Sequence, residues 1–437
     1  LHGATEKEIG TYSDIATAIF LMGWATGGLI FGVLGDRIGR AKTMLITILM
    51  YSAFTGLCSL SQNFWQFAVL RFLTDMGVGG EFAVGVALVA ETMPSAARAP
   101  MLTLLQMLST VGNITAALVN MKLGILEGEG AIQSPWRWMF ALGALPALLA
   151  LIIRWKLKEP DRWKQLSAEA ALEKQLGSYT KLFTDPRWRH NAFVGLALAI
   201  SGIIGLWGVG FYTPDLVKSV MREKLTIAEL DRQLADTGGD PTLTANLQQL
   251  KKQWESSGPV SQKPPLPENI QTAVNGKVTY WGGLASICFQ TGAFVGMFAF
   301  GYVTQKIGRK PTFAIALTAA CLCSLAECLF LGSYNEIFWL VPLVGFFQLS
   351  LFAGYAIYLP ELFPTSLRST GTSFCYNVGR FIGVPMLLAK AGLRELYGGF
   401  ADPWPLRYAG TTMCAVFLVG LIALPFAPET RWKPLPE

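Results

Sequence analysis

Long runs of residues with few charges recur along the whole chain, and they restrict its fold more than any other feature. Eleven runs are found, at approximately 12–34, 43–61, 65–92, 101–124, 136–157, 191–217, 280–304, 311–332, 337–360, 370–392 and 406–427. About 20 apolar residues in a helix cross the hydrocarbon core of a bilayer. The runs lack the alternation of barrel strands, and only helices otherwise satisfy their backbone in lipid. The sequence therefore predicts an all-α membrane protein.

The composition leaves no soluble alternative for these runs. Asp, Glu, Lys and Arg make up 15% of the 437 residues, whereas soluble proteins spend about 25% on them. Apolar residues make up 52%, and the mean hydropathy is +0.41, which is more apolar material than a soluble core of this size buries. We therefore expect the lipid bilayer to be the main surrounding of the chain.

The same figures exclude several classes of function. The net charge of +6 arises without a dense basic run, so we expect no nucleic-acid partner. The seven cysteines lie in apolar runs without a paired CxxC or a nearby histidine, so we expect no metal and no cofactor. The sequence contains no nucleophile with its base, no zinc motif and no phosphate loop, so we do not expect an enzyme.

The basic residues of the connections predict an orientation. Most of them lie in one alternating set of connections, namely 35–42, 93–100, 158–190, 305–310, 361–369 and the tail from 428. The opposite short connections hold chiefly Lys7 and Arg394. Connections rich in Lys and Arg stay in the cytoplasm. We therefore expect a cytoplasmic carboxyl terminus, an outside amino terminus and a bacterial-type inner (plasma) membrane.

Two repeated motifs divide the chain into halves. GDRIGR at 35–40 recurs as TQKIGR at 304–309, an offset of 269 residues, and ETMPSAAR at 91–98 recurs as ELFPTSLR at 361–368, an offset of 270. Nearly equal offsets predict two homologous halves. The second half has six apolar runs and the first has five, so we expect that a span preceding residue 1 is missing.

The predicted domains follow from this repeat. They are an N-terminal transmembrane bundle at 1–157, a cytoplasmic linker at 158–190 and a C-terminal bundle at 191–437, with an extracytoplasmic insert at 218–279. In the insert, Ile227, Leu230 and Leu234, then Leu243, Leu247, Leu250 and Trp254, recur at helical spacing on either side of the breaker 238–241. This pattern predicts a helical hairpin, which we expect to rest on the outer mouth of the bundle.

GVLGDRIGRAK at 32–42 resembles the signature loop of the major facilitator superfamily, and GYVTQKIGRKP at 301–311 resembles its second copy. The segment 71–98, together with ELFPTSLRSTG at 361–371 and PETRW at 428–432, is similar to sugar porters and to aromatic-acid and metabolite proton symporters. The resemblance implies two pseudo-symmetric bundles, with eleven of twelve transmembrane helices present and the first absent, and solute transport by alternating access.

The resemblance also implies a cytoplasmic gate. In the family the signature loop helps to close the cytoplasmic side, and Gln305 replaces its acid in the second copy, so we expect less closure there. A plain topological anchor remains the alternative for the basic residues. The expected gate residues are Asp36, Arg37, Arg40, Glu91, Arg98, Arg309, Glu361 and Arg368.

Charged residues inside the apolar runs are the main functional candidates. Arg71, Asp75 and Glu81 lie within 65–92, Glu327 lies within 311–332 and Arg380 within 370–392. Each costs about 2.5–3.5 kcal/mol at a helix centre, so each should face a partner or the bundle interior. The i, i+4 spacing of Arg71 and Asp75 permits an ion pair, either structural or functional. Glu327 is interpreted as a structural acid.

In related symporters the arginine at the Arg71 position pairs with an acid on the first helix that takes up the proton. Because that helix is absent here, Asp75 and Glu81 are the expected substitutes, so that proton coupling involves Arg71, Asp75 and Glu81. Arg380, in the segment NVGRF, resembles an arginine of organic-anion transporters and could bind a carboxylate. The expected substrate-binding residues are Gln106, Asn113, Trp207, Tyr212, Gln290, Gln348, Tyr355, Asn377 and Arg380.

These features predict a monomeric secondary active transporter whose partners are a small-molecule solute and protons. An organic acid is the favoured solute, and a site near the bilayer midplane is expected. The alternatives are a sugar transporter, an uncoupled facilitator and, from another class, a solute-sensing membrane receptor.

Overall fold

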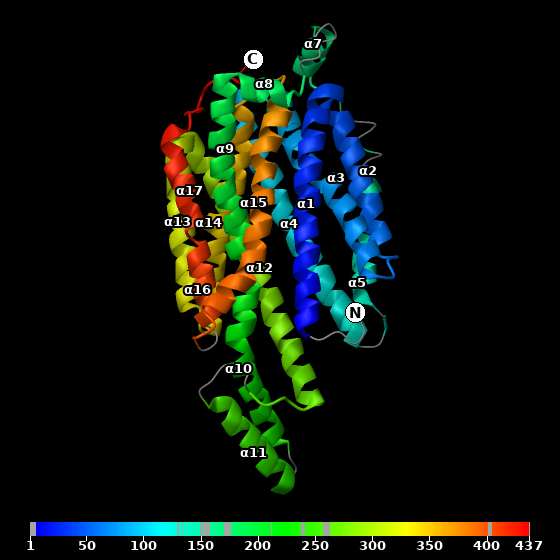
Figure 1. The fold of residues 1–437 in the computed structure, drawn as a ribbon, viewed down its shortest axis with the longest axis vertical. Helices are drawn as coiled ribbons and strands as arrows, with labels where there is room; N and C mark the ends of the chain where they lie inside the picture. Colours follow the sequence, from blue (N-terminus) through cyan, green and yellow to red (C-terminus); the bar gives the residue numbers. More distant parts are fainter. Residues whose placement is uncertain are drawn as a thin grey trace.

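The computed structural model describes residues 6–128, 131–132, 134–148, 152, 158–169, 176–210, 212–236, 241–256, 263–400 and 404–436. The first half and the linker hold α1 (Glu6–Ile38), α2 (Arg40–Cys58), α3 (Phe64–Thr92), α4 (Ser95–Gly128), α5 (Pro135–Leu142), α7 (Asp161–Glu169) and α8 (Tyr179–Thr184). The second half holds α9 (Pro186–Ile204), the π-helix η2 (Gly205–Gly210), α10 (Tyr212–Ala235), α11 (Pro241–Glu255), α12 (Glu268–Ile307), α13 (Arg309–Phe330), α14 (Tyr334–Glu361), α15 (Arg368–Leu396), α16 (Trp404–Met413), α17 (Val416–Ala423) and the 3₁₀ helix η4 (Leu424–Phe426). The prediction of a helical protein is confirmed (Figure 1).

Nine helical segments within the described ranges are long and apolar enough to cross a membrane. They are Ile15–Ile38, Arg40–Cys58, Phe64–Thr92, Ser95–Leu123, Pro186–Gly210, Glu268–Ile307, Arg309–Phe330, Tyr334–Glu361 and Trp404–Phe426. The predicted run 370–392 lies in the helix α15 but is not among the nine, and 136–157 extends outside the described residues. The chain is a multi-pass integral membrane protein, while the predicted number of eleven spans is not confirmed.

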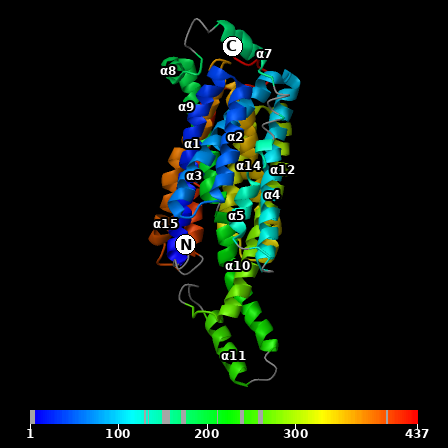
Figure 2. The same ribbon diagram turned by 90° about the vertical axis from the view of Figure 1, so that its right-hand side faces the viewer.

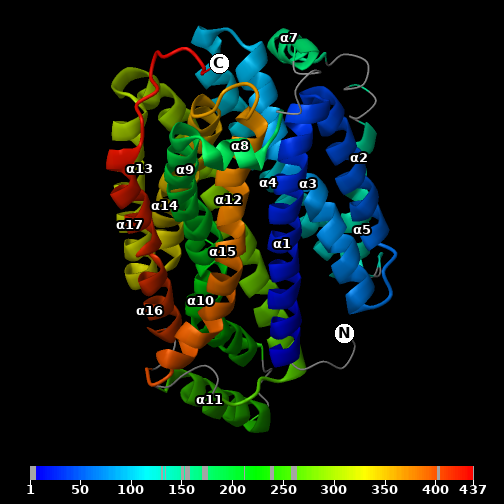
Figure 3. The same ribbon diagram turned by 45° about the horizontal axis from the view of Figure 1, so that its top comes forward.

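The bundle has two distinct ends. Figures 1 and 3 show α7, α8 and the carboxyl terminus together at one end, which we call the linker end. The loops between α1 and α2 and between α12 and α13 also lie there, so both copies of the signature motif share this end. The opposite end, from which α10 and α11 project, we call the insert end (Figures 1 and 2).

Glycines allow very close helix packing at matching places in the two halves. A β-carbon at Gly27 of α1 would overlap the Met76 carbonyl of α3, and one at Gly296 of α12 would overlap the Phe346 carbonyl of α14. Both members of these pairs are related by offsets of 269 and 270 residues. The α1–α3 and α12–α14 contacts are therefore equivalent. The halves meet where α1 packs on α15, and where α4 packs on α12 and α14.

Around the insert, α10, α11 and the first part of α12 form a helical extension beyond the bundle. Figures 1 and 2 show that it projects away from the insert end instead of resting on the mouth, which differs from our expectation. The reason is helical continuity, because α10 follows η2 directly and α12 runs for 40 residues. Leu230, Leu247 and Trp254 are buried in the extension. The predicted breaker at 238–241 lies outside the described residues except for Pro241.

One ion-pair cluster stabilises the extension. The carboxylate of Glu229 is buried and lies 2.6 Å from Arg232 Nη2 and 2.7 Å from Lys277 Nζ. Burial by itself would raise the pKa of Glu229, but Lys277 and Arg232 hold this pKa below its usual value. The cluster thus connects α10 with α12 at the base of the extension.

Candidate functional site

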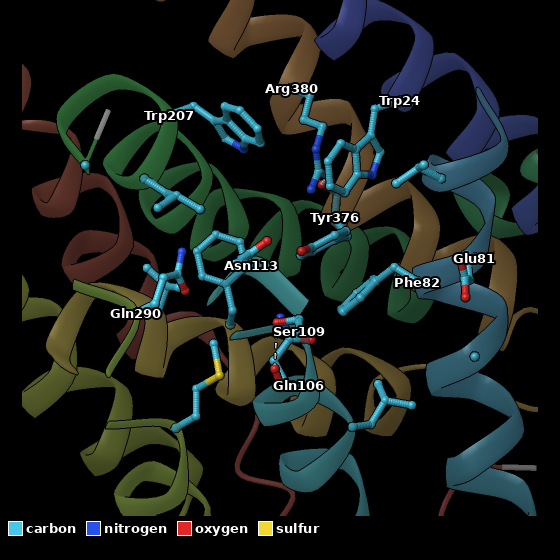
Figure 4. Close-up of a pocket in the computed structure, with 18 of the residues that line it drawn as sticks. Trp24, Glu81, Phe82, Gln106, Ser109, Asn113, Trp207, Gln290, Tyr376 and Arg380 are labelled. Atoms are coloured by element: carbon cyan, nitrogen blue, oxygen red, sulfur yellow. Dashed lines mark hydrogen bonds between the residues drawn. The ribbon is translucent and has the colours of Figure 1, made fainter. Parts of the chain in front are cut away.

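A cavity of about 750 Å³ lies between the two halves. Its size falls within the range of about 300–1,000 Å³ that is usual for small-molecule sites. The first half contributes α1, α3 and α4 to its wall, and the second half contributes η2, α10, α12, α14 and α15. The polar or aromatic residues of the wall are Phe20, Trp24, Glu81, Phe82, Gln106, Ser109, Asn113, Trp207, Thr213, Ser286, Phe289, Gln290, Phe352, Tyr376 and Arg380 (Figure 4).

Arg380 is the strongest charge of the wall. The side chain is 1% exposed, and its guanidinium carbon lies 4.3 Å from the ring centres of both Trp24 and Tyr376. Nη1 donates to the Tyr376 carbonyl at 2.6 Å and to Asn377 Oδ1 at 3.1 Å. Nε has no hydrogen-bond partner among the described residues. Aromatic faces stabilise the cation, and at least one N–H remains available to a ligand.

Three polar side chains of α4 form one stripe toward the cavity. Gln106, Ser109 and Asn113 are spaced i, i+3 and i+7, which places them on one helix face. Ser109 Oγ donates to its own helix at the Gln106 carbonyl, 2.7 Å away. From the other half, Gln290 of α12 faces the same space, and its Oε1 has no partner in the described structure. The cavity therefore offers amide groups as well as a cation.

Four other residues that we expected at the substrate lie elsewhere. Tyr355 is buried in the second half, where its hydroxyl donates to the Leu198 carbonyl at 2.7 Å. Gln348 is also buried and donates to Ser324 Oγ at 2.7 Å. Asn377 contacts Arg380 but does not line the cavity, and the side chain of Tyr212 lies outside the described residues. Helical spacing identifies an inward face but cannot separate a core position from a cavity wall.

Aromatic residues that we did not single out make up much of the wall. Phe82 of α3 stacks on Tyr376 of α15 with ring centres 3.7 Å apart. Trp207 of η2 lies 5.1 Å from Phe20 and 6.1 Å from Trp24, both on α1. Each contact joins the two halves. The sequence carries no signal for them, because aromatic residues are also common at lipid interfaces.

The three candidates for proton coupling occupy two places. Glu81 lines the cavity. Arg71 Nε and Asp75 Oδ2 form an ion pair of 3.2 Å away from the cavity wall, with Asp75 only 1% exposed. The guanidinium of Arg71 covers the ring of Phe20 at 4.8 Å, and Phe20 belongs to the wall. The ion pair therefore communicates with the cavity only through that aromatic ring.

A buried charge network joins the halves at the linker end. Glu91 Oε1 accepts from Arg40 Nη2 at 3.0 Å and from Arg368 Nη1 at 2.8 Å. Asp36 Oδ1 lies 2.9 Å from Arg40 Nη2. The same carboxylate accepts from the backbone N–H groups of Ser369 and Thr370, at 3.2 and 2.8 Å. Asp36 thus caps α15, whose N-terminal dipole favours an anion, and this end of the cavity is closed.

The pairing differs from the pairs suggested by sequence spacing. We expected Glu91 with Arg98 and Glu361 with Arg368, each seven residues apart. Instead, Glu91 pairs with Arg368 of the other half, and Arg98 Nε donates to the Ala90 carbonyl at 2.9 Å. Glu361 pairs with Arg309 of its own half at 2.9 Å. A seven-residue separation across a turn does not determine which helix docks nearby.

The remaining motif residues make local contacts. Arg37 Nε donates to the Leu176 carbonyl of the linker at 3.1 Å. Gln305 donates to the Gly301 carbonyl of its own helix at 2.8 Å, so the second motif copy makes no contact like that of Asp36. The second copy therefore acts within its own half.

Two glutamates that we did not identify cap the helices after the signature motifs. Glu159 accepts from the backbone N–H groups of Arg40, Ala41 and Lys42, at 2.7, 3.2 and 3.1 Å. Glu429 accepts from those of Arg309 and Lys310, at 3.0 and 3.1 Å. Burial alone would raise the pKa of Glu429, but the backbone donors hold this pKa below its usual value. The pair repeats at an offset of 270 residues, a signal that the sequence does contain.

Comparisons with known proteins agree with this architecture. The family described as "Sugar (and other) transporter" matches residues 2–207 and 241–435. The chain is 26% identical over 417 residues to the cis,cis-muconate transport protein of Acinetobacter baylyi, covering 95% of this chain and 84% of that protein. It is 26% identical over 392 residues to the sialic acid transporter NanX of Escherichia coli, covering 89% and 78%. The solved proton:xylose symporter XylE of the major facilitator superfamily has a TM-score of 0.67 at 17% identity, with 99% of this chain and 90% of that one covered.

Proposed function

Because the chain belongs to the sugar (and other) transporter family and is a secondary transporter of a small solute, we propose that this solute is an organic carboxylate bound by Arg380. The observation that carries the proposal is the state of this arginine. It is buried in the cavity wall, and its Nε has no partner within the described part of the chain. A guanidinium offers paired N–H groups that match the two oxygens of a carboxylate.

The relatives support an acid over a sugar. Muconate and sialic acid both carry a carboxylate, and the transporters named for them are similar to this chain over most of its length. One observation favours a sugar as the second candidate. The amides of Gln106, Asn113 and Gln290 face the cavity and suit hydroxyl groups, and the solved relative is a xylose symporter.

Proton coupling is the second part of the proposal. Glu81 is the acid of the cavity wall, and Arg71 with Asp75 forms a switchable ion pair behind Phe20. The network around Glu91 holds the halves together at the linker end, which the basic connections assign to the cytoplasm of a bacterial-type inner membrane. Rocking of the two halves would break this network and open the cavity to that side.

The test uses purified protein in proteoliposomes with labelled cis,cis-muconate, sialic acid and xylose as separate probes. An imposed pH gradient should drive accumulation of an acid, and an uncoupler should abolish it. Arg380→Gln removes the charge at similar size, and we expect binding to weaken by about 2 kcal/mol or more, roughly 30-fold.

Arg407→Lys serves as the matched control, since Arg407 is a buried arginine of the same half that binds backbone carbonyls away from the cavity. Xylose transport that Arg380→Gln leaves unchanged would refute the carboxylate proposal in favour of the sugar. Uptake that ignores the pH gradient would refute coupling.

A further inference from the structure

A buried acid of the second half has no part in the cavity wall. Glu327 of α13 is 1% exposed, and its Oε1 has no hydrogen-bond partner among the described residues. It lies in Arg309–Phe330, one of the segments able to cross a membrane. A carboxylate buried without a counter-charge is costly, so such a group is held neutral by a proton. A structural acid would instead have a basic partner.

The charged and titratable groups near Glu327 provide no such partner. The thiols of Cys323 and Cys328 face it from its own helix. On α16, Arg407 and Cys414 face Cys328, and Arg407 donates to the backbone carbonyls at 328, 329 and 331. Glu336 of α14 faces Arg407. The guanidinium is thus engaged at the end of α13.

The side chain of Thr213 separates Glu327 from the cavity. Thr213 faces the Glu327 carboxyl and also lines the cavity. It is 2% exposed, and its Oγ1 has no partner of normal hydrogen-bond geometry in the described structure. A hydroxyl both accepts and donates a hydrogen. Thr213 is therefore placed to connect the buried carboxyl with the solute space.

A third unsatisfied oxygen lies nearby. Gln348 of α14 is buried and donates from Nε2 to Ser324 Oγ, one helical turn before Glu327. Its Oε1 has no partner in the described ranges, and a β-carbon on Gly210 would lie only 2.7 Å from it. Gly210 is a wall residue of the cavity. Unpaired oxygens from three helices thus gather directly behind one part of the wall.

The wall at this point is the π-helix η2, Gly205–Gly210, which precedes Thr213 by a few residues. Short π-helical segments are rare and occur often at functional sites. Return of this segment to α-helical geometry would rotate the start of α10, including Thr213. Such a rotation would change the access of Glu327 to the cavity.

We infer that Glu327 is a proton-binding site of the second half, exchanging its proton with the cavity through Thr213. This inference rests on the proposed proton-coupled transport and adds a coupling residue to it. On release, the O–H bond of the carboxyl group breaks, and Thr213 accepts that hydrogen while passing its own to a water molecule of the cavity. The carboxylate remains, and uptake reverses these steps.

The first test is independent of the solute. Protein in nanodiscs is taken through a pH step, and infrared difference spectra follow the stretch of protonated carboxyl groups. We expect a band that titrates and that Glu327→Gln removes, while Glu81→Gln leaves this band in place. In Thr213→Val, which keeps the shape but lacks the hydroxyl, hydrogen–deuterium exchange of the band should slow. A spectrum that Glu327→Gln does not change would overturn the inference.

The second test measures coupling with cis,cis-muconate in proteoliposomes. Glu327→Gln should lower accumulation driven by a pH gradient more than it lowers counterflow, by a factor in the usual coupling range of about 5–150. Equal loss of both, or loss of neither, would contradict the inference. If no variant and no wild-type protein transports muconate, the proposed solute fails, and the infrared result alone decides on Glu327.

Should Glu327→Gln unfold, Thr213→Val keeps both tests decisive. A normal exchange rate of the carboxyl band in that variant would refute the pathway through Thr213.

Discussion

Removal of one charge at the linker end should shift the transporter toward the conformation that is open there. Glu91 receives hydrogen bonds from Arg40 and Arg368, which belong to different halves, and all three side chains are buried. Replacing it by Gln leaves two buried guanidinium groups without that anion. Breaking a buried charge pair costs about 3–5 kcal/mol. Because Asp36 still pairs with Arg40 at 2.9 Å, we take about 3 kcal/mol, or roughly 150-fold.

Pulsed spin-label distances measure this shift. Labels at Lys42 and Lys306, both exposed at the linker end and on different halves, replace cysteines introduced in a background without the native seven. In wild-type protein the short distance should dominate. Glu91→Gln should populate a longer distance as the major component, and a high concentration of salt should not reproduce this change, since the network is shielded from solvent.

Glu361→Gln is the matched control. Glu361 holds the equivalent place in the second half, but its partner Arg309 belongs to that same half. Its loss should lower thermal stability without a change of the distance between the halves. An unchanged distance distribution in a stable Glu91→Gln protein would refute our account of the gate, as would an equal shift in the control.

Three further outcomes are expected. The backbone N–H groups at the start of α13 keep the pKa of Glu429 below its usual value, so the stabilisation is complete above the ordinary pKa of about 4.3 and disappears as pH falls through the lower, folded value; Glu429→Gln should remove this part of the pH dependence of thermal unfolding. Gly27→Val should destabilise the protein by about 1–3 kcal/mol or prevent folding, because its β-carbon would overlap the Met76 carbonyl, and detergent thermal unfolding tests this. Trp24→Ala removes one of two aromatic faces on Arg380 and should change muconate affinity by up to about 2 kcal/mol in calorimetry; an affinity equal to that of wild type would contradict the role of this contact.

The sequence by itself determined the class of fold. Apolar runs of about 20 residues can exist in lipid only as helices, so their positions follow from local composition without knowledge of any contact. The offset of 269–270 residues likewise indicated two halves, and the structure places Gly27 with Gly296 at equivalent contacts. Arg380 stood out for the same local reason, since a charge in an apolar run must find a special environment.

Tertiary structure alone decided which residues meet. Glu91 lies seven residues from Arg98 but binds Arg368, because docking of α15 against the first half brings that guanidinium within reach. Tyr355 has the spacing of an inward-facing residue, yet it donates to a backbone carbonyl in the core, whereas Phe82 reaches the cavity by stacking across the interface. Helical periodicity defines a face within one helix, but the neighbour of that face depends on how separate helices pack, and that information is not local.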